Sequence, residues 1–141
     1  MIRPGAAADI LRGVARAFAA ADQAVVTELA LANGRRADLV ALDRAGTITV
    51  VEVKASRADF LADRKWPEYL RYCDRFYFAV AEGFPLELLP AEGLIRADRY
   101  AAEILREAPL RRLVAARRKA LLIRFARASA GRLQALLDPP L

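Results

Sequence analysis

Histidine is absent from the 141-residue sequence, and cysteine occurs only once, at Cys73. The lack of histidine excludes a Ser-His-Asp triad, a histidine general base and histidine metal ligands. A single cysteine forms neither an internal disulfide nor a thiolate zinc site. Any metal ion must therefore be held by carboxylate and carbonyl oxygens, and such ligands suit the hard cations Mg²⁺ and Mn²⁺.

Long apolar stretches are missing as well. The chain has no run of about 18 uncharged apolar residues, so no membrane-spanning helix is expected. Asp9 and Arg12 interrupt the only N-terminal stretch that could serve as the apolar part of a signal peptide. We therefore expect a cytoplasmic protein with no membrane partner. The length favours one domain that covers residues 1–141.

The net charge of +6 is unevenly distributed along the chain. From Arg106 to Arg132 there are nine basic residues and one acidic residue, whereas the rest of the chain has 14 basic and 16 acidic residues. A basic C-terminal helical segment at 106–137, beside a mildly acidic body, is typical of a protein that binds a polyanion. The alternative is a solvated helix in a protein that is rich in arginine and alanine.

The N-terminal half predicts a helix followed by an antiparallel meander. Residues 6–22 carry apolar side chains at helical spacing. Asn33-Gly34 and the residues 43–46 are turn sequences that separate β-rich segments, and such short loops join antiparallel strands. The three predicted strands cover residues 24–31, 36–43 and 47–55.

The C-terminal half alternates helices and strands. Ser56 can cap a helical turn, and Pro67 predicts a break near Lys65 and a second helix that starts at the proline. Strands are expected at 75–80 and 93–97, and helices from about Arg99 and over 110–128. The apolar stripe expected for the last helix comprises Leu110, Val114, Leu121 and Phe125, and Gly131 is expected to end or kink it. The fold class is α/β, as an α+β arrangement with a mixed sheet.

The pattern that carries chemistry is Asp38 followed, fourteen residues later, by Glu52-Val53-Lys54. Side chains alternate along a strand, so Glu52 and Lys54 share one face, and the preceding strand can place Asp38 beside Glu52. Two adjacent carboxylates repel unless a divalent cation lies between them. Lys54 can orient a water or offset charge on a scissile phosphate. The alternative is a surface ion pair of about 0–1 kcal/mol.

The order of helix, three strands, helix and strand, with this Asp…Glu-x-Lys pattern, resembles the PD-(D/E)xK nuclease superfamily. The stretch VEVKASRADFLADRKWPEYLRYCDRFYFAV, which ends at Val80, and the segment ARRKALLIRFAR (Ala116–Arg127) further resemble the MmcB-like family of bacterial DNA-repair proteins. The resemblance covers roughly residues 8–137. It implies a restriction-endonuclease-like αβββαβ core with extra C-terminal helices.

The resemblance also implies roles for individual residues. Asp38 and Glu52 would be metal ligands for Mg²⁺ or Mn²⁺, the Val53 carbonyl a third ligand, and Lys54 the catalytic lysine. Ala37 stands where the superfamily pattern has proline, and that position is often relaxed. The chain is thus expected to be a metal-dependent DNA-repair endonuclease that acts on DNA phosphodiester bonds.

Glu28 is the best candidate for a further acidic residue that many superfamily members place upstream. If strand alternation points Glu28 inward, it completes the site. If not, it is a charge on the strand surface, and the sequence does not decide between the two. Asp22 and Asp9 are the fallback candidates.

Five further residues are candidate DNA contacts. Lys65 and Tyr69 lie four residues apart, so on a helix they would share a face and could touch a phosphate or stack on a base. Trp66 beside them is expected to be a packed core aromatic, whereas Asp63 and Arg64 are expected to be solvated. In the basic segment, the candidate phosphate contacts are Arg117, Arg118 and Lys119.

Two other functions fit the same residues. The chain could be a catalytically inactive module of the same fold that binds DNA or bridges repair proteins, or an interaction protein whose arginine-rich helix binds an acidic partner. DNA is the expected partner in the first two cases, with other repair proteins as further candidates. Small nucleases of this fold often need two sites to cut both strands, which makes a homodimer an alternative to a monomer.

Overall fold

Six strands form one mixed sheet in the order β1-β2-β3-β4-β5-β6. A computed structural model describes residues 5–141, so residues 1–4 of the predicted single domain lie outside it. Strands β1 (Ala24–Ala30), β2 (Arg36–Leu42) and β3 (Ile48–Val53) run antiparallel as a meander, and β4 (Arg75–Val80) pairs parallel with β3. Strand β5 (Gly93–Ala97) is parallel to β4, and β6 (Ala102–Arg106) is antiparallel to β5. The mixed-sheet α+β fold class is confirmed.

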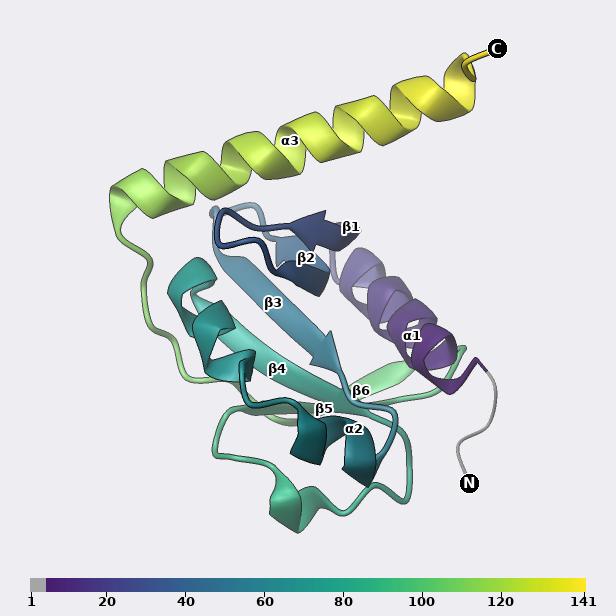
Figure 1. Ribbon diagram of the computed structural model, residues 1–141, viewed down its shortest axis with the longest axis vertical. Helices are drawn as coiled ribbons and strands as arrows, with labels where there is room; N and C mark the ends of the chain where they lie inside the picture. Colours follow the sequence, from purple (N-terminus) through teal and green to yellow (C-terminus); the bar gives the residue numbers. More distant parts are fainter. Residues whose placement is uncertain (1–4) are drawn as a thin grey trace.

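Helices cover both faces of this sheet (Figure 1). Helix α1 (Ala6–Ala20) buries Ile10, Val14 and Phe18 against one face. The short helix α2 (Arg57–Ala62), the 3-10 helix η1 (Trp66–Tyr72) and the long helix α3 (Ala115–Leu137) lie on the other side. The cores on the two faces are separate apolar clusters with the sheet between them. No helix within residues 5–141 is long and apolar enough to cross a membrane.

The connection after β3 folds as the sequence predicts in outline. The Ser56 side chain caps α2 by accepting a hydrogen bond of 3.0 Å from the backbone N–H of Asp59. The chain then breaks at Lys65, and Pro67 lies in the first turn of the next helix. That second helix is a 3-10 helix rather than the expected α-helix.

The C-terminal part corrects four predictions. The helix expected from about Arg99 is absent from the described residues, where β6 forms instead. One C-terminal helix follows rather than several, and it starts after Val114, so Leu110 and Val114 are exposed and precede it. Gly131 neither ends nor interrupts α3, which continues to Leu137. Leu121 and Phe125 are buried as predicted.

Candidate functional site

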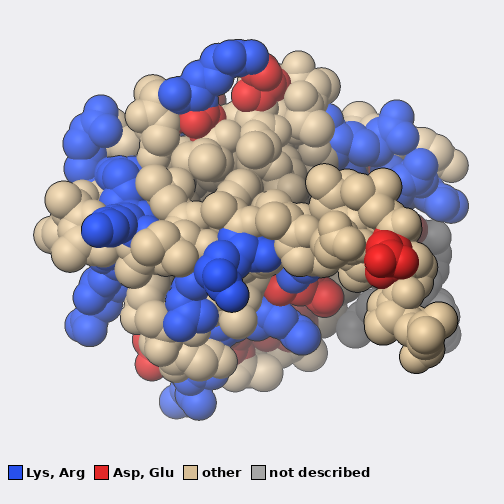
Figure 2. All heavy atoms as spheres, turned by 90° about the horizontal axis from the view of Figure 1, so that it is seen from above, with Lys and Arg blue, Asp and Glu red and all other residues tan. Residues whose placement is uncertain are grey.

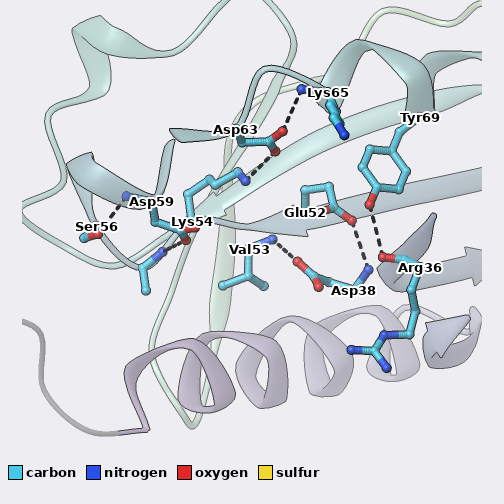
Figure 3. Close-up of polar contacts among 11 residues, drawn as sticks. Arg36, Asp38, Glu52, Val53, Lys54, Ser56, Asp59, Asp63, Lys65 and Tyr69 are labelled. Atoms are coloured by element: carbon cyan, nitrogen blue, oxygen red, sulfur yellow. Dashed lines mark hydrogen bonds and ion pairs between the residues drawn. The ribbon is translucent and has the colours of Figure 1, made fainter. Parts of the chain in front are cut away.

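Strands β2 and β3 stop pairing where the two candidate carboxylates lie. Their backbone ladder runs from Leu42 opposite Ile48 to Leu39 opposite Val51. Beyond it, the backbone N–H of Asp38 donates to Oε1 of Glu52 at 3.0 Å. The backbone N–H of Val53 in turn donates to Oδ2 of Asp38 at 2.8 Å (Figure 3). Side chains thus replace the ladder bonds at this point, and both carboxyl groups are fixed in position.

The two carboxyl groups share a poorly solvated environment. Only 5% of the surface of Glu52 is exposed, and Asp38 is half-buried. Burial raises the pKa of Asp38, and burial together with the charge of Asp38 raises the pKa of Glu52 to about 8. A site of this kind takes up positive charge, either as a proton or as a metal cation.

Lys54 lies on the same side of β3 as Glu52 but binds a different carboxylate. Its side chain is 6% exposed, and its Nζ lies 2.6 Å from Oδ2 of Asp63. The other oxygen of Asp63 accepts a hydrogen bond of 2.8 Å from the backbone N–H of Lys65. Partial burial opposes ionisation of Asp63, but the hydrogen bond from Lys54 and the backbone N–H groups of Lys65 and Trp66 lower its pKa. The ammonium of Lys54 is therefore held by a carboxylate that stays ionised.

Asp63 is the residue that sequence reasoning missed, because it was expected to be solvated. The one indication in the sequence was its position, just after α2 and before the break at Lys65. An aspartate at such a break can accept hydrogen bonds from the next turn of backbone. The sequence contains no indication that Lys54, nine residues upstream, lies within reach of it.

The sequence left open whether Glu28 joins the site, and the structure places it on the strand surface instead. Glu28 adopts a left-handed backbone conformation with φ of 51°, which breaks the alternation on which that prediction depended. Its side chain is exposed and has no hydrogen bond or ion pair to Asp38 or Glu52 within residues 5–141. It lines a hollow with arginines of α3 instead. The fallback residues also lie elsewhere, because Asp22 pairs with Arg44 and Asp9 lies 4.0 Å from Arg99.

Lys65 and Tyr69, the two predicted DNA contacts after β3, differ in exposure. Lys65 is exposed at the rim of the site. Tyr69 is 7% exposed, stacks on Phe76, and donates its hydroxyl to the backbone oxygen of Arg36 at 3.1 Å. A packed ring cannot stack on a base, so the prediction for Tyr69 is wrong in that respect. Trp66 packs on Phe76 as well, which confirms its expected core role.

The basic segment proves to be largely structural. Arg118 forms two hydrogen bonds to the buried Asp74 at 2.6 and 2.7 Å, so the prediction of a phosphate contact there is wrong. Arg117 lies over the Tyr72 ring and donates to the backbone oxygen of Arg71. Lys119 is exposed, and its role as a phosphate contact stays a prediction. Seen from above, the Lys and Arg side chains form several separate groups rather than one patch (Figure 2).

Within residues 5–141 no group of three or more Asp, Glu, His or Cys side chains is arranged to hold a metal ion. A metal ion bound by Asp38 and Glu52 would therefore have two carboxylate ligands. The Val53 carbonyl stays the predicted third ligand. Mg²⁺ commonly binds one or two carboxylates and retains several waters, so the donors present fit this ion.

Comparisons with known proteins identify one family and one solved structure. The family model described as DNA repair protein MmcB-like matches residues 2–140. A solved structure described as the SPO1766 protein of unknown function from Silicibacter pomeroyi is 51% identical in sequence. It superimposes with a TM-score of 0.92, and the match covers 95% of this chain and 92% of that one. A search of curated proteins found no match.

Proposed function

The chain belongs to the MmcB-like family of DNA repair proteins, and from its site we propose that it is a divalent-metal-dependent nuclease of the PD-(D/E)xK type. The observation that carries the proposal is the pairing of Asp38 and Glu52 where β2 and β3 separate, with Lys54 on the same side of β3. DNA is the proposed substrate because the family is named for DNA repair. An endonuclease dependent on Mg²⁺ or Mn²⁺ is the specific form proposed.

The chemistry of the donors supports a metal cofactor. Asp38 and Glu52 would hold the ion together with the Val53 carbonyl, and all three are hard oxygen donors. When bound, Mg²⁺ supplies Lewis-acid polarisation of the scissile phosphate. The raised pKa of Glu52 indicates that the carboxyl pair is stabilised by added positive charge.

Lys54 and Asp63 would act together on the phosphate side of the site. The Lys54 ammonium can stabilise the negative charge that grows on the phosphate oxygens, in a place where little water competes. Asp63 holds that ammonium at 2.6 Å and is itself anchored by backbone N–H groups. Asp63 is therefore proposed as a positioning residue for Lys54.

Nicking of supercoiled plasmid by purified protein in Mg²⁺ or Mn²⁺ tests the proposal. Lys54→Ala should slow nicking by at least about 100-fold while DNA binding in Ca²⁺ persists. Asp63→Asn should lower kcat by roughly 10- to 100-fold with little change in KM, because it displaces Lys54 without removing it. Arg16→Ala, which removes an exposed basic side chain from α1 on the other face of the sheet, is the matched control and should nick normally.

Two outcomes contradict parts of the proposal. Nicking that persists in Lys54→Ala would remove the lysine from the reaction. DNA binding by the wild-type protein without cleavage of any substrate would favour the alternative, an inactive module that binds DNA or bridges repair partners. Asp63→Glu distinguishes a positioning role from a role in folding. Its longer carboxylate can still reach Lys54, so it should recover part of the nicking rate that Asp63→Asn loses.

A further inference from the structure

We propose that a hollow beside the Lys54–Asp63 pair binds a phosphate group of the nucleic acid next to the scissile one. This inference rests on the proposed function, because it places a substrate group relative to that site. The hollow, here called the rim hollow, measures about 260 Å³. Its lining residues are Arg35, Ala62, Asp63, Arg64, Lys65 and Tyr69.

The rim hollow is rich in positive charge that has no partner in the protein. Arg64 and Lys65 are both exposed, and neither side chain forms a hydrogen bond or ion pair within the described range 5–141. Arg35, from the turn between β1 and β2, reaches the hollow while it bonds Glu68 at 2.7 Å. Adjacent cations repel one another, so an anion in the hollow relieves an existing repulsion.

The single carboxylate of the rim hollow is already occupied. One oxygen of Asp63 binds Lys54, and the other accepts the backbone N–H of Lys65. The negative charge of Asp63 is already balanced by the ammonium of Lys54, so it does not also neutralise Arg64 and Lys65. The hollow therefore stays cationic although it contains an aspartate.

The rim hollow and the candidate catalytic site share Asp63. In Figure 3, Lys65 and Tyr69 lie on the same side of Glu52 as Asp63, and Lys54 reaches Asp63 from β3. The proposal places one phosphate of a strand at the carboxylates and the neighbouring phosphate in the rim hollow. Tyr69 is fixed by its stacking on Phe76, so this side of the hollow is rigid.

Phosphate suits the rim hollow better than a base does. Arginine and lysine are the side chains that bind phosphate oxygens, and arginine does so through a planar fork. The aromatic ring of the hollow is already stacked within the core, so it has no free face for a base. The phosphate can come from within a strand, as a phosphodiester, or from a strand end, as a terminal 5′-phosphate.

Binding of labelled single-stranded oligonucleotides, with and without a 5′-phosphate, tests the inference. The measurement is made in Ca²⁺ over a range of salt concentrations, so that cleavage does not interfere. The double variant Arg64→Ala/Lys65→Ala should bind several-fold more weakly at low salt. Its plot of log affinity against log salt should be shallower by about 0.7 for each phosphate that the variant no longer neutralises.

The matched control is Arg12→Ala/Arg16→Ala, which removes two exposed arginines from α1 on the opposite face of the sheet. It should bind with the affinity and salt slope of the wild type. A weakening in the rim variant that is equal for both oligonucleotides identifies a phosphodiester within the strand. A weakening confined to the 5′-phosphorylated oligonucleotide identifies the terminal phosphate.

Equal affinity and salt slope in the rim variant and the wild type, for both oligonucleotides, overturns the inference. Thermal unfolding of each variant checks that it is folded, as expected for exposed side chains. Because binding is measured without turnover, a wild type that never cleaves DNA contradicts the proposed nuclease and leaves this test intact. A wild type that cleaves, with a rim variant that binds normally, contradicts the rim hollow alone.

Discussion

At the residue scale, Asp38 and Glu52 are held together against their own repulsion. Each accepts a backbone N–H across the gap between β2 and β3, and both lie where water is scarce. The folded protein therefore prefers one of them protonated when no cation is present. This preference links the stability of the protein to pH and, if the proposed metal binds here, to divalent cations.

Glu52→Gln is predicted to change how stability depends on pH in a chelating buffer. The pKa of Glu52 is raised from 4.5 to about 8, so its protonated form favours folding. Its contribution to the free energy of unfolding is therefore complete below pH 4.5. The contribution is lost as pH rises from 4.5 towards 8, by at most about 1.4 kcal/mol for each pH unit. Urea unfolding should show the loss in the wild type, and a much smaller one in Glu52→Gln.

The exposed Glu87 provides the control for this prediction, since Glu87→Gln should follow the wild type. Addition of Mg²⁺ at pH 8 should stabilise the wild type and have little effect on Glu52→Gln. Parallel pH profiles for all three proteins would contradict the raised pKa of Glu52.

At the element scale, α3 is attached to the body by arginines that bond to the sheet and its loops. The Asp74 carboxylate accepts hydrogen bonds from the side chain of Arg118 and from the backbone N–H groups of Ile48 and Leu113. Burial opposes its ionisation, but these hydrogen bonds lower the pKa of Asp74 to about 2. Arg132 donates to the backbone oxygens of Thr27 and Glu28 and so covers the edge of β1. The basic composition of the segment therefore serves packing as well as any polyanion.

Arg118→Ala is predicted to destabilise the protein by about 3 kcal/mol, because it leaves the buried carboxylate of Asp74 without its cation. Lys119→Ala, one residue along α3, should change stability by less than about 0.5 kcal/mol, because its side chain is exposed. Urea unfolding at pH 7 compares the two. Similar stability for both variants would contradict a stabilising role for the pair of Arg118 and Asp74.

The elements predicted from periodicity are those with a clear apolar pattern. The predicted meander of β1, β2 and β3 is confirmed. Its turns could be found in the sequence because each needs a glycine at positive φ, Gly34 in one and Gly46 in the other. The segment after Arg99 was predicted as a helix and is a strand, because β5 provides it with an antiparallel neighbour. Pairing of this kind depends on a partner strand and is invisible in a local pattern.

At the scale of the whole molecule, the sheet separates two apolar cores, and the candidate site lies where two of its strands diverge. The C-terminal turns of α3 extend beyond the sheet (Figure 1), and the side chains of Leu133, Leu136 and Leu137 there are largely exposed. These residues contribute little buried surface to the fold. The family model and the solved relative both match nearly the whole length of this chain, including α3.

A chain that ends after Arg132 is predicted to keep the fold, with a change in unfolding free energy below about 1 kcal/mol. A shorter chain that ends after Ala126 lacks Arg132 and uncovers the edge of β1. It should be less stable and should aggregate at lower concentration, since free strand edges pair with other chains. Urea unfolding and light scattering compare the two. Equal stability and equal aggregation of the two truncated chains would contradict the proposed role of Arg132 at the edge of β1.

The sequence alone determined that Asp38, Glu52 and Lys54 could meet, because two-residue alternation and short turns follow from local chemistry. Only the tertiary structure decided what else surrounds them. Asp63 pairs with Lys54 and Arg118 pairs with Asp74, each through a contact between different elements, and Glu28 points outward at a left-handed backbone position. Such contacts depend on where the chain returns in space, and that is set by the packing of the whole sheet and its helices.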